Sequence, residues 1–254
     1  MHGTRGALPN LVVIGAMKCG TTALHHYLDR HPEIVMSRPK ELNFFFGSAD
    51  GEPCVAGEHV DWLRGNWHRG PAWYAARFDP AAPVRGEASP GYTSPSYPEV
   101  AGRMAALVPS ARLVYAVRDP VARAVSQYAH HRRDGTEFRD LGSALLDPAS
   151  QYVARGRYFE RLAPFLAAGP GERIAVVAQE ELRTDPRATL RAVFAHVDVD
   201  DGYWSPAMTE RRNEAPEPLP RLDEGLRHRL TDALADDAGR LREFAGRDFP
   251  GWSV

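Results

Sequence analysis

Short apolar runs alternate with segments of helical periodicity along this chain. Three apolar runs predict buried strands, at residues 11–15, 112–117 and 173–178, and a shorter apolar segment covers residues 34–36. Apolar positions at helical spacing predict helices over residues 21–30, 121–133, 151–168, 187–196 and 221–235. Strands that alternate with helices form parallel sheets covered on both faces. We therefore predict one α/β domain over residues 1–254, with a P-loop-like, three-layer fold in which helices flank a central parallel sheet.

Two segments depart from this alternation. Residues 1–10 are predicted to form a flexible tail. Residues 47–85 contain glycine, proline and three tryptophans, and their periodicity is weak. We interpret residues 47–85 as a helix-containing insertion over a cleft. The alternative is a satellite core built on the aromatic side chains.

The loop after the first predicted strand has the form of a phosphate-binding loop. Its pattern is Gly15-x-x-x-x-Gly20-Thr21-Thr22, which supplies glycines, backbone N–H groups and a helix N-terminus. The ATP- and GTP-binding version places a lysine after the second glycine, where it reaches the terminal phosphates. Here Thr21 takes that position, and Lys18 stands three residues earlier. The pattern therefore favours a phosphate-bearing donor other than ATP.

Almost all basic residues of this chain are arginines rather than lysines. Of 31 Lys and Arg residues, only Lys18 and Lys40 are lysines. Lysine offers a compact point charge that arginine does not replace at every site. We therefore interpret both lysines as functional candidates, with chance as the alternative.

Bulk properties exclude several classes of function. The net charge of −2 lacks the basic excess of a general nucleic-acid binder, although a local basic pocket is compatible with it. No apolar stretch is long enough to span a membrane, and residues 1–10 hold no long apolar signal segment. We expect a cytoplasmic protein that does not act on membranes. Cys19 and Cys54 are too few for a zinc site, and the histidines lack metal-binding spacing, so no metal is expected.

Four segments, in this order, resemble the sulfotransferases that use 3′-phosphoadenosine 5′-phosphosulfate (PAPS). The likeness is to the heparan-sulfate (carbohydrate) sulfotransferases and their bacterial relatives. The segments are residues 14–24, 40–45, 86–92 and 113–128. Residues 241–248 and Trp252 also resemble the end of bacterial members, so the resemblance covers residues 11–252.

The resemblance implies PAPS as the donor and assigns roles around it. Lys18 would stabilise the leaving group, as the lysine of the 5′-phosphosulfate loop. Residues with a predicted donor-binding role are Lys18, Cys19, Gly20, Thr21 and Thr22 on the loop, and Arg118 and Ser126 at the 3′-phosphate. Ser126 would reach that phosphate only if its helix packs beside the site.

Glu41 is the predicted general base, and it would need a pKa raised by burial to act near neutral pH. Its alternative role is a surface carboxylate paired with Lys40. Further acceptor-side candidates are Lys40, Glu87, Ser89, His59 and His68. Glu87 has a structural role as its alternative, and either of the two histidines would serve as base if Glu41 is misplaced. Tyr158 faces either the nucleotide or the core, and residues 211–213 either close over the donor or lie in solvent.

One departure from the family pattern bears on the acceptor. The third segment has Ala88 where the heparan-sulfate enzymes carry a lysine associated with the acceptor. We therefore expect transfer to a hydroxyl of a small-molecule or sugar-bearing acceptor, such as a secondary metabolite, with an amine acceptor left open. The main alternative is a P-loop kinase or NTPase that uses Mg-ATP. A nucleotide-binding regulator without turnover is the second.

Overall fold

The computed structural model describes residues 7–51, 64–210 and 219–254. Within these ranges, five parallel strands form one sheet in the order β2-β3-β1-β4-β5. The strands are β1 (Leu11–Gly15), β2 (Ile34–Met36), β3 (Val84–Ala88), β4 (Arg112–Val117) and β5 (Ile174–Ala178). This sheet confirms the predicted fold class.

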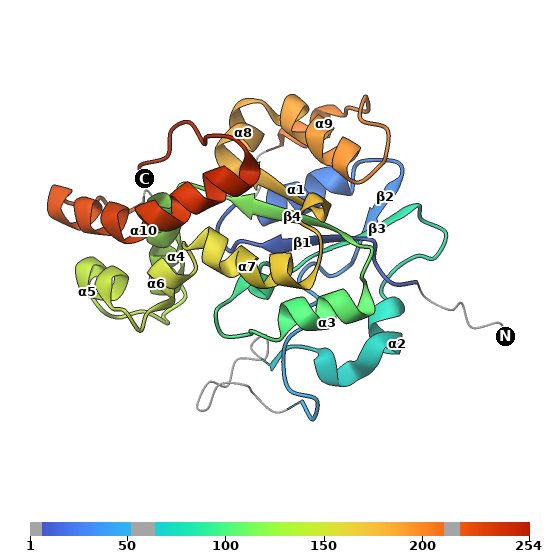
Figure 1. The fold of residues 1–254 in the computed structure, drawn as a ribbon, viewed down its shortest axis with the longest axis horizontal. Coiled ribbons are helices and arrows are strands. Elements are labelled where there is room, and N and C mark those ends of the chain that lie inside the picture. Colours follow the sequence, from blue (N-terminus) through green and yellow to red (C-terminus); the bar gives the residue numbers. More distant parts are fainter. Residues whose placement is uncertain (1–6, 52–63, 211–218) are drawn as a thin grey trace.

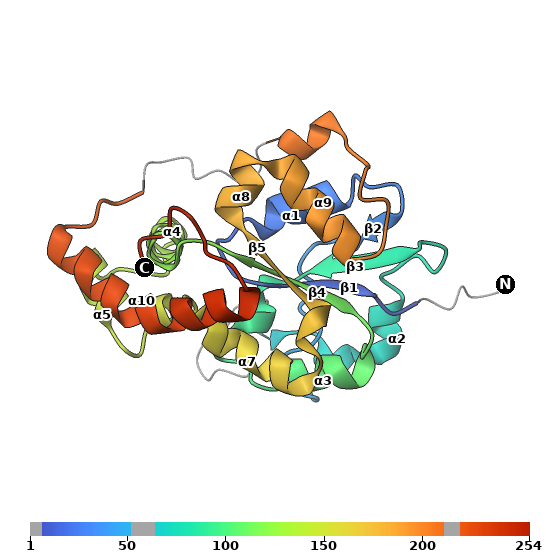
Figure 2. The ribbon, with the colours of Figure 1, turned by 45° about the horizontal axis from the view of Figure 1, so that its top comes forward.

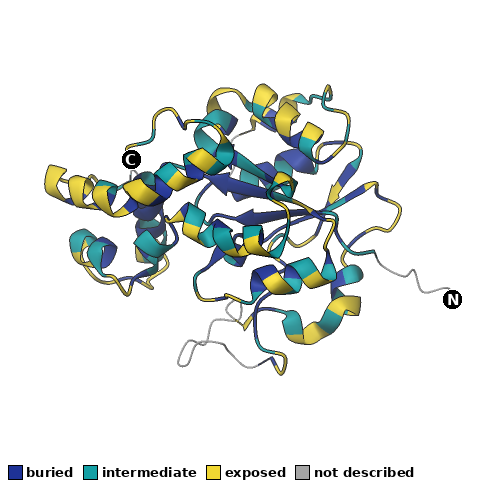
Figure 3. Cartoon of the chain, viewed as in Figure 1, coloured by how far each residue is buried: buried dark blue, intermediate teal, exposed yellow. Residues whose placement is uncertain are grey.

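Helices cover both faces of the sheet (Figures 1 and 2). One face carries α1 (Thr21–Leu28), α8 (Gln179–Thr184) and α9 (Pro186–His196), and the other carries α3 (Val100–Leu107) and α7 (Tyr158–Ala168). The short helix α2 (Gly70–Ala75) lies near α3. Every residue of β1 is buried, and Figure 3 shows the central strands as the buried layer between exposed helix faces. Coverage on both sides explains why this strand is apolar throughout rather than alternating.

A second, smaller core lies beside the sheet (Figure 1). It is formed by α4 (Pro120–Arg133), α5 (Leu141–Leu146), α6 (Gln151–Ala154) and α10 (Glu224–Ala245). Its buried residues are Val121, Ala124, Val125, Tyr128, Ala144, Leu145, Tyr152, Leu226, Leu230 and Leu234. This cluster fixes α4, which begins at the carboxyl end of β4.

The start signals of α4 are those expected from the sequence. Pro120 is the first helical residue, and the side chain of Asp119 accepts a hydrogen bond from the Ala122 N–H at 2.6 Å. Such a cap satisfies one of the free N–H groups of the first turn. The cap also joins the carboxyl end of the chain, because the Ser253 hydroxyl donates to Asp119 at 2.7 Å.

Several predicted boundaries differ from the structure. Residues 151–168 form two helices, α6 and α7, because the chain leaves the helix at 155–157, where Gly156 packs closely against Leu234 of α10. The helix predicted to end at 235 continues to Ala245. Strand β3 and helices α3, α5 and α8 were not predicted from the sequence. Strand β3 has the sequence Val-Arg-Gly-Glu-Ala. Its two charged residues do not fit the apolar pattern of a buried strand, although tertiary contacts bury it.

The described part of the predicted insertion packs as an aromatic layer. Tyr74 stacks on Phe44, with ring centroids 4.1 Å apart, and Trp67 and Trp73 also contact Phe44. No described residue of 47–85 lines the cleft presented below. These contacts favour the satellite core over a cover for the cleft, while residues 52–63 lie outside the described ranges.

Candidate active site

A cleft of about 1700 Å³ opens at the carboxyl ends of the strands. The chain leaves β1 toward β2 at one edge of the sheet and leaves β4 toward β5 at the other edge. Ligands of open α/β sheets bind at such a reversal of strand order. The residues predicted to bind the donor follow these two strands, and the cleft is the candidate active site.

The loop between β1 and α1 forms one wall of the cleft. Lys18, Gly20, Thr21 and Thr22 line it. Gly20 is left-handed, with φ of 82°, and a Cβ there would lie 3.1 Å from Nε2 of Gln179. Glycine is therefore required for both the turn and the close approach. Lys18 has φ of 70°, a sparsely populated conformation for a lysine that is typical of functional loops.

Cys19 points away from the cleft into the core. Its thiol lies 3.3 Å from the Tyr158 hydroxyl, which donates to the Arg118 carbonyl at 2.8 Å. Tyr158 is fully buried, so its core role is the one observed. Through this contact the thiol of the loop is tied to the end of β4, and burial raises the pKa of the Cys19 thiol to about 11.

Positive charge gathers around Lys18. Burial lowers the pKa of Lys18, and the nearby Arg133 and Arg118 lower it further, while Asp134 opposes them. Arg118 and Arg133 also line the cleft. Ser126, on the second turn of α4, lines it as well, because α4 packs beside the loop. The arrangement is suited to a ligand with several negative charges.

Glu41 lines the cleft from a different segment. It has φ of 65°, and its carboxylate contacts the ammonium group of Lys40. The Glu41 side chain is 47% exposed. The expected burial of this carboxylate is therefore wrong, and the pairing with Lys40, the alternative role, is present. Its position in the cleft wall is nevertheless compatible with contact to an acceptor.

The buried carboxylate is Glu87 instead. It accepts hydrogen bonds from the hydroxyls of Ser89 at 2.8 Å and Tyr92 at 2.7 Å, and from that of Tyr74. Glu87 and Ser89 are both fully buried, so neither side chain reaches an acceptor in the cleft. Their prediction as substrate-binding residues is corrected to a structural role. Burial raises the pKa of Glu87, and the three hydroxyl donors lower it in part.

The network around Glu87 supports the segment that carries Glu41. The Ser89 hydroxyl accepts from the Asn43 N–H at 3.0 Å, and the Tyr92 hydroxyl accepts from the Phe44 N–H at 3.0 Å. Asn43 also has a positive φ, of 47°, and lines the cleft. The buried hydrogen bonds thus hold two residues of the cleft wall in strained conformations.

Other predicted site residues lie elsewhere. His68 does not line the cleft and packs against Gly51. His59 and residues 211–213 lie outside the described ranges. Sequence reasoning missed several residues of the cleft wall, namely Asn43, His130, Arg133, Asp134, Arg155 and Gln179. The spacing of His130 and Asp134, four residues apart in a helix, was the available signal, since such a pair shares one face.

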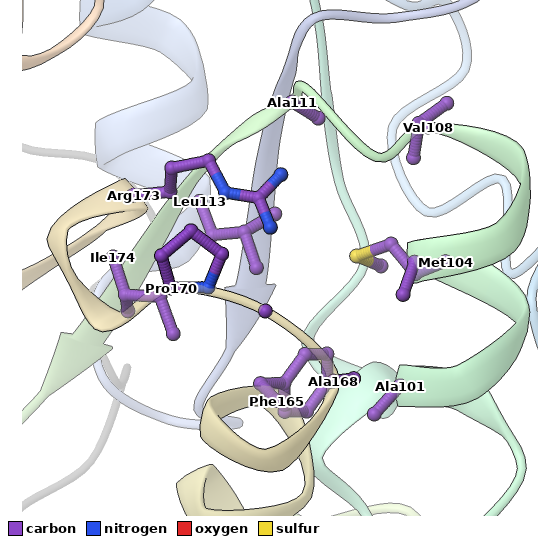
Figure 4. A pocket seen from close by; sticks show the side chains of 12 residues that line it. Ala101, Met104, Val108, Ala111, Leu113, Phe165, Ala168, Pro170, Arg173 and Ile174 are labelled. Carbon is purple, nitrogen blue, oxygen red and sulfur yellow. The ribbon is translucent and has the colours of Figure 1, made fainter.

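A second, much smaller pocket lies at the opposite end of the sheet (Figure 4). Its volume is about 30 Å³, and Met104, Phe165 and Ile174 are among its apolar lining residues. The space is sufficient for about one water molecule. We interpret it as imperfect packing between α3 and α7.

Within the described ranges, no group of three or more histidine, cysteine or carboxylate side chains is arranged to hold a metal ion. None of the helices in the same ranges combines the length and apolar character needed to cross a membrane.

The chain matches known proteins along most of its length. A profile described as "Sulfotransferase family" matches residues 9–205. The chain is 25% identical to bifunctional heparan sulfate N-deacetylase/N-sulfotransferase 2 of Bos taurus, over 96% of this chain and 30% of that protein. It is 31% identical to heparan sulfate glucosamine 3-O-sulfotransferase 3B1 of Mus musculus, over 73% of this chain and 45% of that protein. It therefore spans less than half the length of either relative.

Solved structures agree with these matches. The crystal structure of a sulfotransferase from Alicyclobacillus acidocaldarius superposes with a TM-score of 0.79 and 28% identity, covering 98% of this chain and 100% of that one. The sulfotransferase domain of the Synechococcus PCC 7002 olefin synthase has the same fold, with a TM-score of 0.60 at 18% identity. A P-loop kinase is not favoured by these findings. Together with the profile match over most of its length, they show that this chain belongs to the sulfotransferase family.

Proposed function

We propose that this protein transfers a sulfuryl group from PAPS to a hydroxyl of a small-molecule or sugar-bearing acceptor. The observation that carries the proposal is the convergence of Lys18, Arg118 and Ser126 on one cleft. These residues come from two strands and a helix that meet only at the reversal of strand order. Membership of the family supports the same reaction.

The residues of the cleft fit the chemistry of the donor. Backbone N–H groups at the start of α1, with the hydroxyls of Thr21 and Thr22, suit the 5′-phosphate. The guanidinium of Arg118 makes no ion pair or hydrogen bond with the described residues, and it offers two parallel donors to the 3′-phosphate. Bound there, PAPS supplies the activated sulfuryl group, and everything else the reaction requires is positioning and neutralisation of charge.

Lys18 holds the position from which negative charge on the leaving group is neutralised. Its ammonium is partly buried among cationic neighbours, so a polyanionic ligand relieves mutual repulsion among them. A hydrogen bond that strengthens as charge develops is worth about 3–4 kcal/mol of barrier in comparable enzymes. Such help comes from a preorganised group, and the left-handed backbone of Lys18 fixes its side chain on the cleft side of the loop.

Glu41 takes the proton of the attacking hydroxyl in this scheme. Its carboxylate is accessible from the cleft and rests against Lys40, so the acceptor would displace or share that contact. The relatives include both N- and O-sulfotransferases by name. We propose O-sulfation, because a carboxylate base is needed to ionise a hydroxyl, whereas a neutral amine attacks without one.

Calorimetric titration with 3′-phosphoadenosine 5′-phosphate tests the donor class. We expect metal-independent binding of this bisphosphate and weak binding of ATP with Mg²⁺. Arg118→Ala should weaken bisphosphate binding, and Arg112→Ala, an exposed arginine at the opposite end of β4, is the matched control. Preference for Mg-ATP would reject the proposal in favour of a kinase or NTPase.

A further inference from the structure

The part of the cleft wall near α6 contains a buried arginine without a carboxylate partner. Arg155 is 7% exposed and lines the cleft. Its Nε donates to the side-chain oxygen of Gln151 at 2.6 Å, and its Nη2 donates to the Ser94 hydroxyl at 3.0 Å. Its third nitrogen, Nη1, makes no hydrogen bond with the described residues. Both partners of the guanidinium are neutral.

Among the described residues, no carboxylate acts appreciably on Arg155. Burial lowers its pKa to about 10, and the cations Arg123 and Arg161 lower it further, while only the phenol of Tyr97 opposes them. Arg123 is fully buried, and its hydrogen-bond acceptors among the described residues are neutral oxygens, those of Gln127 and the Tyr152 backbone. A buried cation is costly unless a negative charge completes its environment. The site is therefore complete only with an anion from the cleft.

Glu137, a carboxylate that also lines the cleft, is already engaged. Glu137 binds Arg139 at 2.7 Å and accepts a hydrogen bond from the Tyr152 hydroxyl at 3.1 Å. Glu137 does not contribute appreciably to the charge balance of Arg155, although it acts on the neighbouring His131. Within the part of the chain that the structure describes, Arg155 therefore has no carboxylate partner.

Arg155 is separate from the groups that suit the donor. Its hydrogen bond to Ser94 attaches it to the segment after β3, whereas the donor groups follow β1 and β4. The charged residues that act most strongly on Lys18 are Arg133, Asp134 and Arg118. The segment after β3 also contributes Pro90 and Gly91 to the cleft, and Gly91 lies close to the side chain of Asn43. Arg155 therefore belongs to the half of the cleft left for the acceptor.

We propose that Arg155 is the anchor for an anionic group on the acceptor, so that the acceptor carries a carboxylate or similar anion besides its accepting hydroxyl. This inference rests on the proposed function. It names a specificity-determining residue and the charge of the acceptor. Nη1 supplies the charged hydrogen bond, while Gln151 and Ser94 hold the guanidinium in place.

A matched pair of probes tests the charge preference. Protein saturated with 3′-phosphoadenosine 5′-phosphate is titrated with 4-hydroxybenzoate and with its neutral analogue 4-hydroxybenzamide. We expect the wild type to prefer the carboxylate by about tenfold, the usual value of one charge-assisted hydrogen bond. Arg155→Gln should abolish the preference, and Arg157→Gln, an exposed arginine two residues away, should retain it.

Three results overturn the inference. The first is equal affinity of the wild type for the two probes. The second is an unchanged preference in Arg155→Gln, and the third is a loss of bisphosphate affinity by about tenfold in that variant, which would make Arg155 a donor residue. If neither probe binds detectably, a crystal soaked in selenate tests whether Arg155 binds an anion. Anomalous density beside Nη1 would support the proposed anchor, and no such density would refute the proposal. Failure of the bisphosphate to bind the wild type rejects the proposed function separately, and the selenate soak then still tests the anion site.

Discussion

Removing one hydroxyl from the network beneath Glu41 should destabilise the protein more than an equivalent change elsewhere. Tyr92→Phe deletes the oxygen that donates to Glu87 at 2.7 Å and accepts from the Phe44 N–H at 3.0 Å. Both partners are fully buried. The ring of Tyr92 stays, together with its edge-to-face contact to Phe45, whose centroid is 5.4 Å away. The change therefore isolates the hydrogen bonds.

The size of the destabilisation follows from the hydrogen bonds that Glu87 and the Phe44 N–H lose. A buried N–H left without an acceptor costs about 1–3 kcal/mol, and a hydrogen bond to a charged group contributes about 1.5–3 kcal/mol. The two losses share one oxygen, and Glu87 can respond by taking up a proton because burial already raises its pKa. We therefore expect the free energy of unfolding to fall by about 2–4 kcal/mol. The corresponding fall in Tm is about 4–16 °C.

Urea unfolding, followed by tryptophan fluorescence, measures this difference. The control is Tyr128→Phe, which removes the same atom from a buried tyrosine whose hydroxyl donates to the Arg139 carbonyl at 2.9 Å. That loss should cost only about 0.5–1.5 kcal/mol. Turnover of Tyr92→Phe should also fall while bisphosphate binding persists, because the network holds Glu41 and not the donor groups.

Equal destabilisation by Tyr92→Phe and Tyr128→Phe would refute the reasoning. It would mean that the buried hydrogen bonds of the Glu87 network contribute no more than an ordinary tyrosine–carbonyl bond. Normal turnover in a clearly destabilised Tyr92→Phe variant would refute the claim that the Glu87 network positions Glu41.

Three further predictions concern the cleft. Lys18→Met should lower kcat by about 10²–10³-fold with the fold intact, as measured by steady-state kinetics; near-normal kcat would reject the leaving-group role. Glu41→Gln should retain donor binding and lose turnover, whereas equal loss of both would mark Glu41 as structural. Burial, with His130 and Arg155, lowers the pKa of His131 from 6.5 to about 4, so the unfolded chain binds more protons there and stability should fall as pH drops from about 6.5 to 4. The difference between the urea midpoints at the two ends should be smaller in His131→Gln than in the control His228→Gln, an exposed histidine; unchanged pH dependence in both would contradict the assignment.

Much of the architecture was predictable because local pattern and tertiary role agree. Strands β1 and β4 were predicted with their observed bounds, since strands buried on both faces are continuously apolar. The loop after β1 was predictable as a tight turn into a helix, because glycine adopts the left-handed conformation of Gly20 at little cost. Strand β3 was not predictable, because it contains Glu87, a residue type that is usually exposed. Glu87 is buried only because the fold brings three hydroxyl donors around its carboxylate.

The sequence by itself determined most of the strands and helices, their order and the glycine-containing loop after β1, because these depend on periodicity and on residue types at fixed spacing. Only the tertiary structure decided which carboxylate is buried and which faces the cleft, since burial is a property of the assembled core. It placed Glu87 inside and left Glu41 half-exposed, the reverse of the environment expected for Glu41. It also brought Arg155 to the cleft with neutral partners 4 and 61 residues away along the chain. No local pattern encodes such a charge imbalance, because it depends on which of the described side chains come to surround Arg155 in three dimensions.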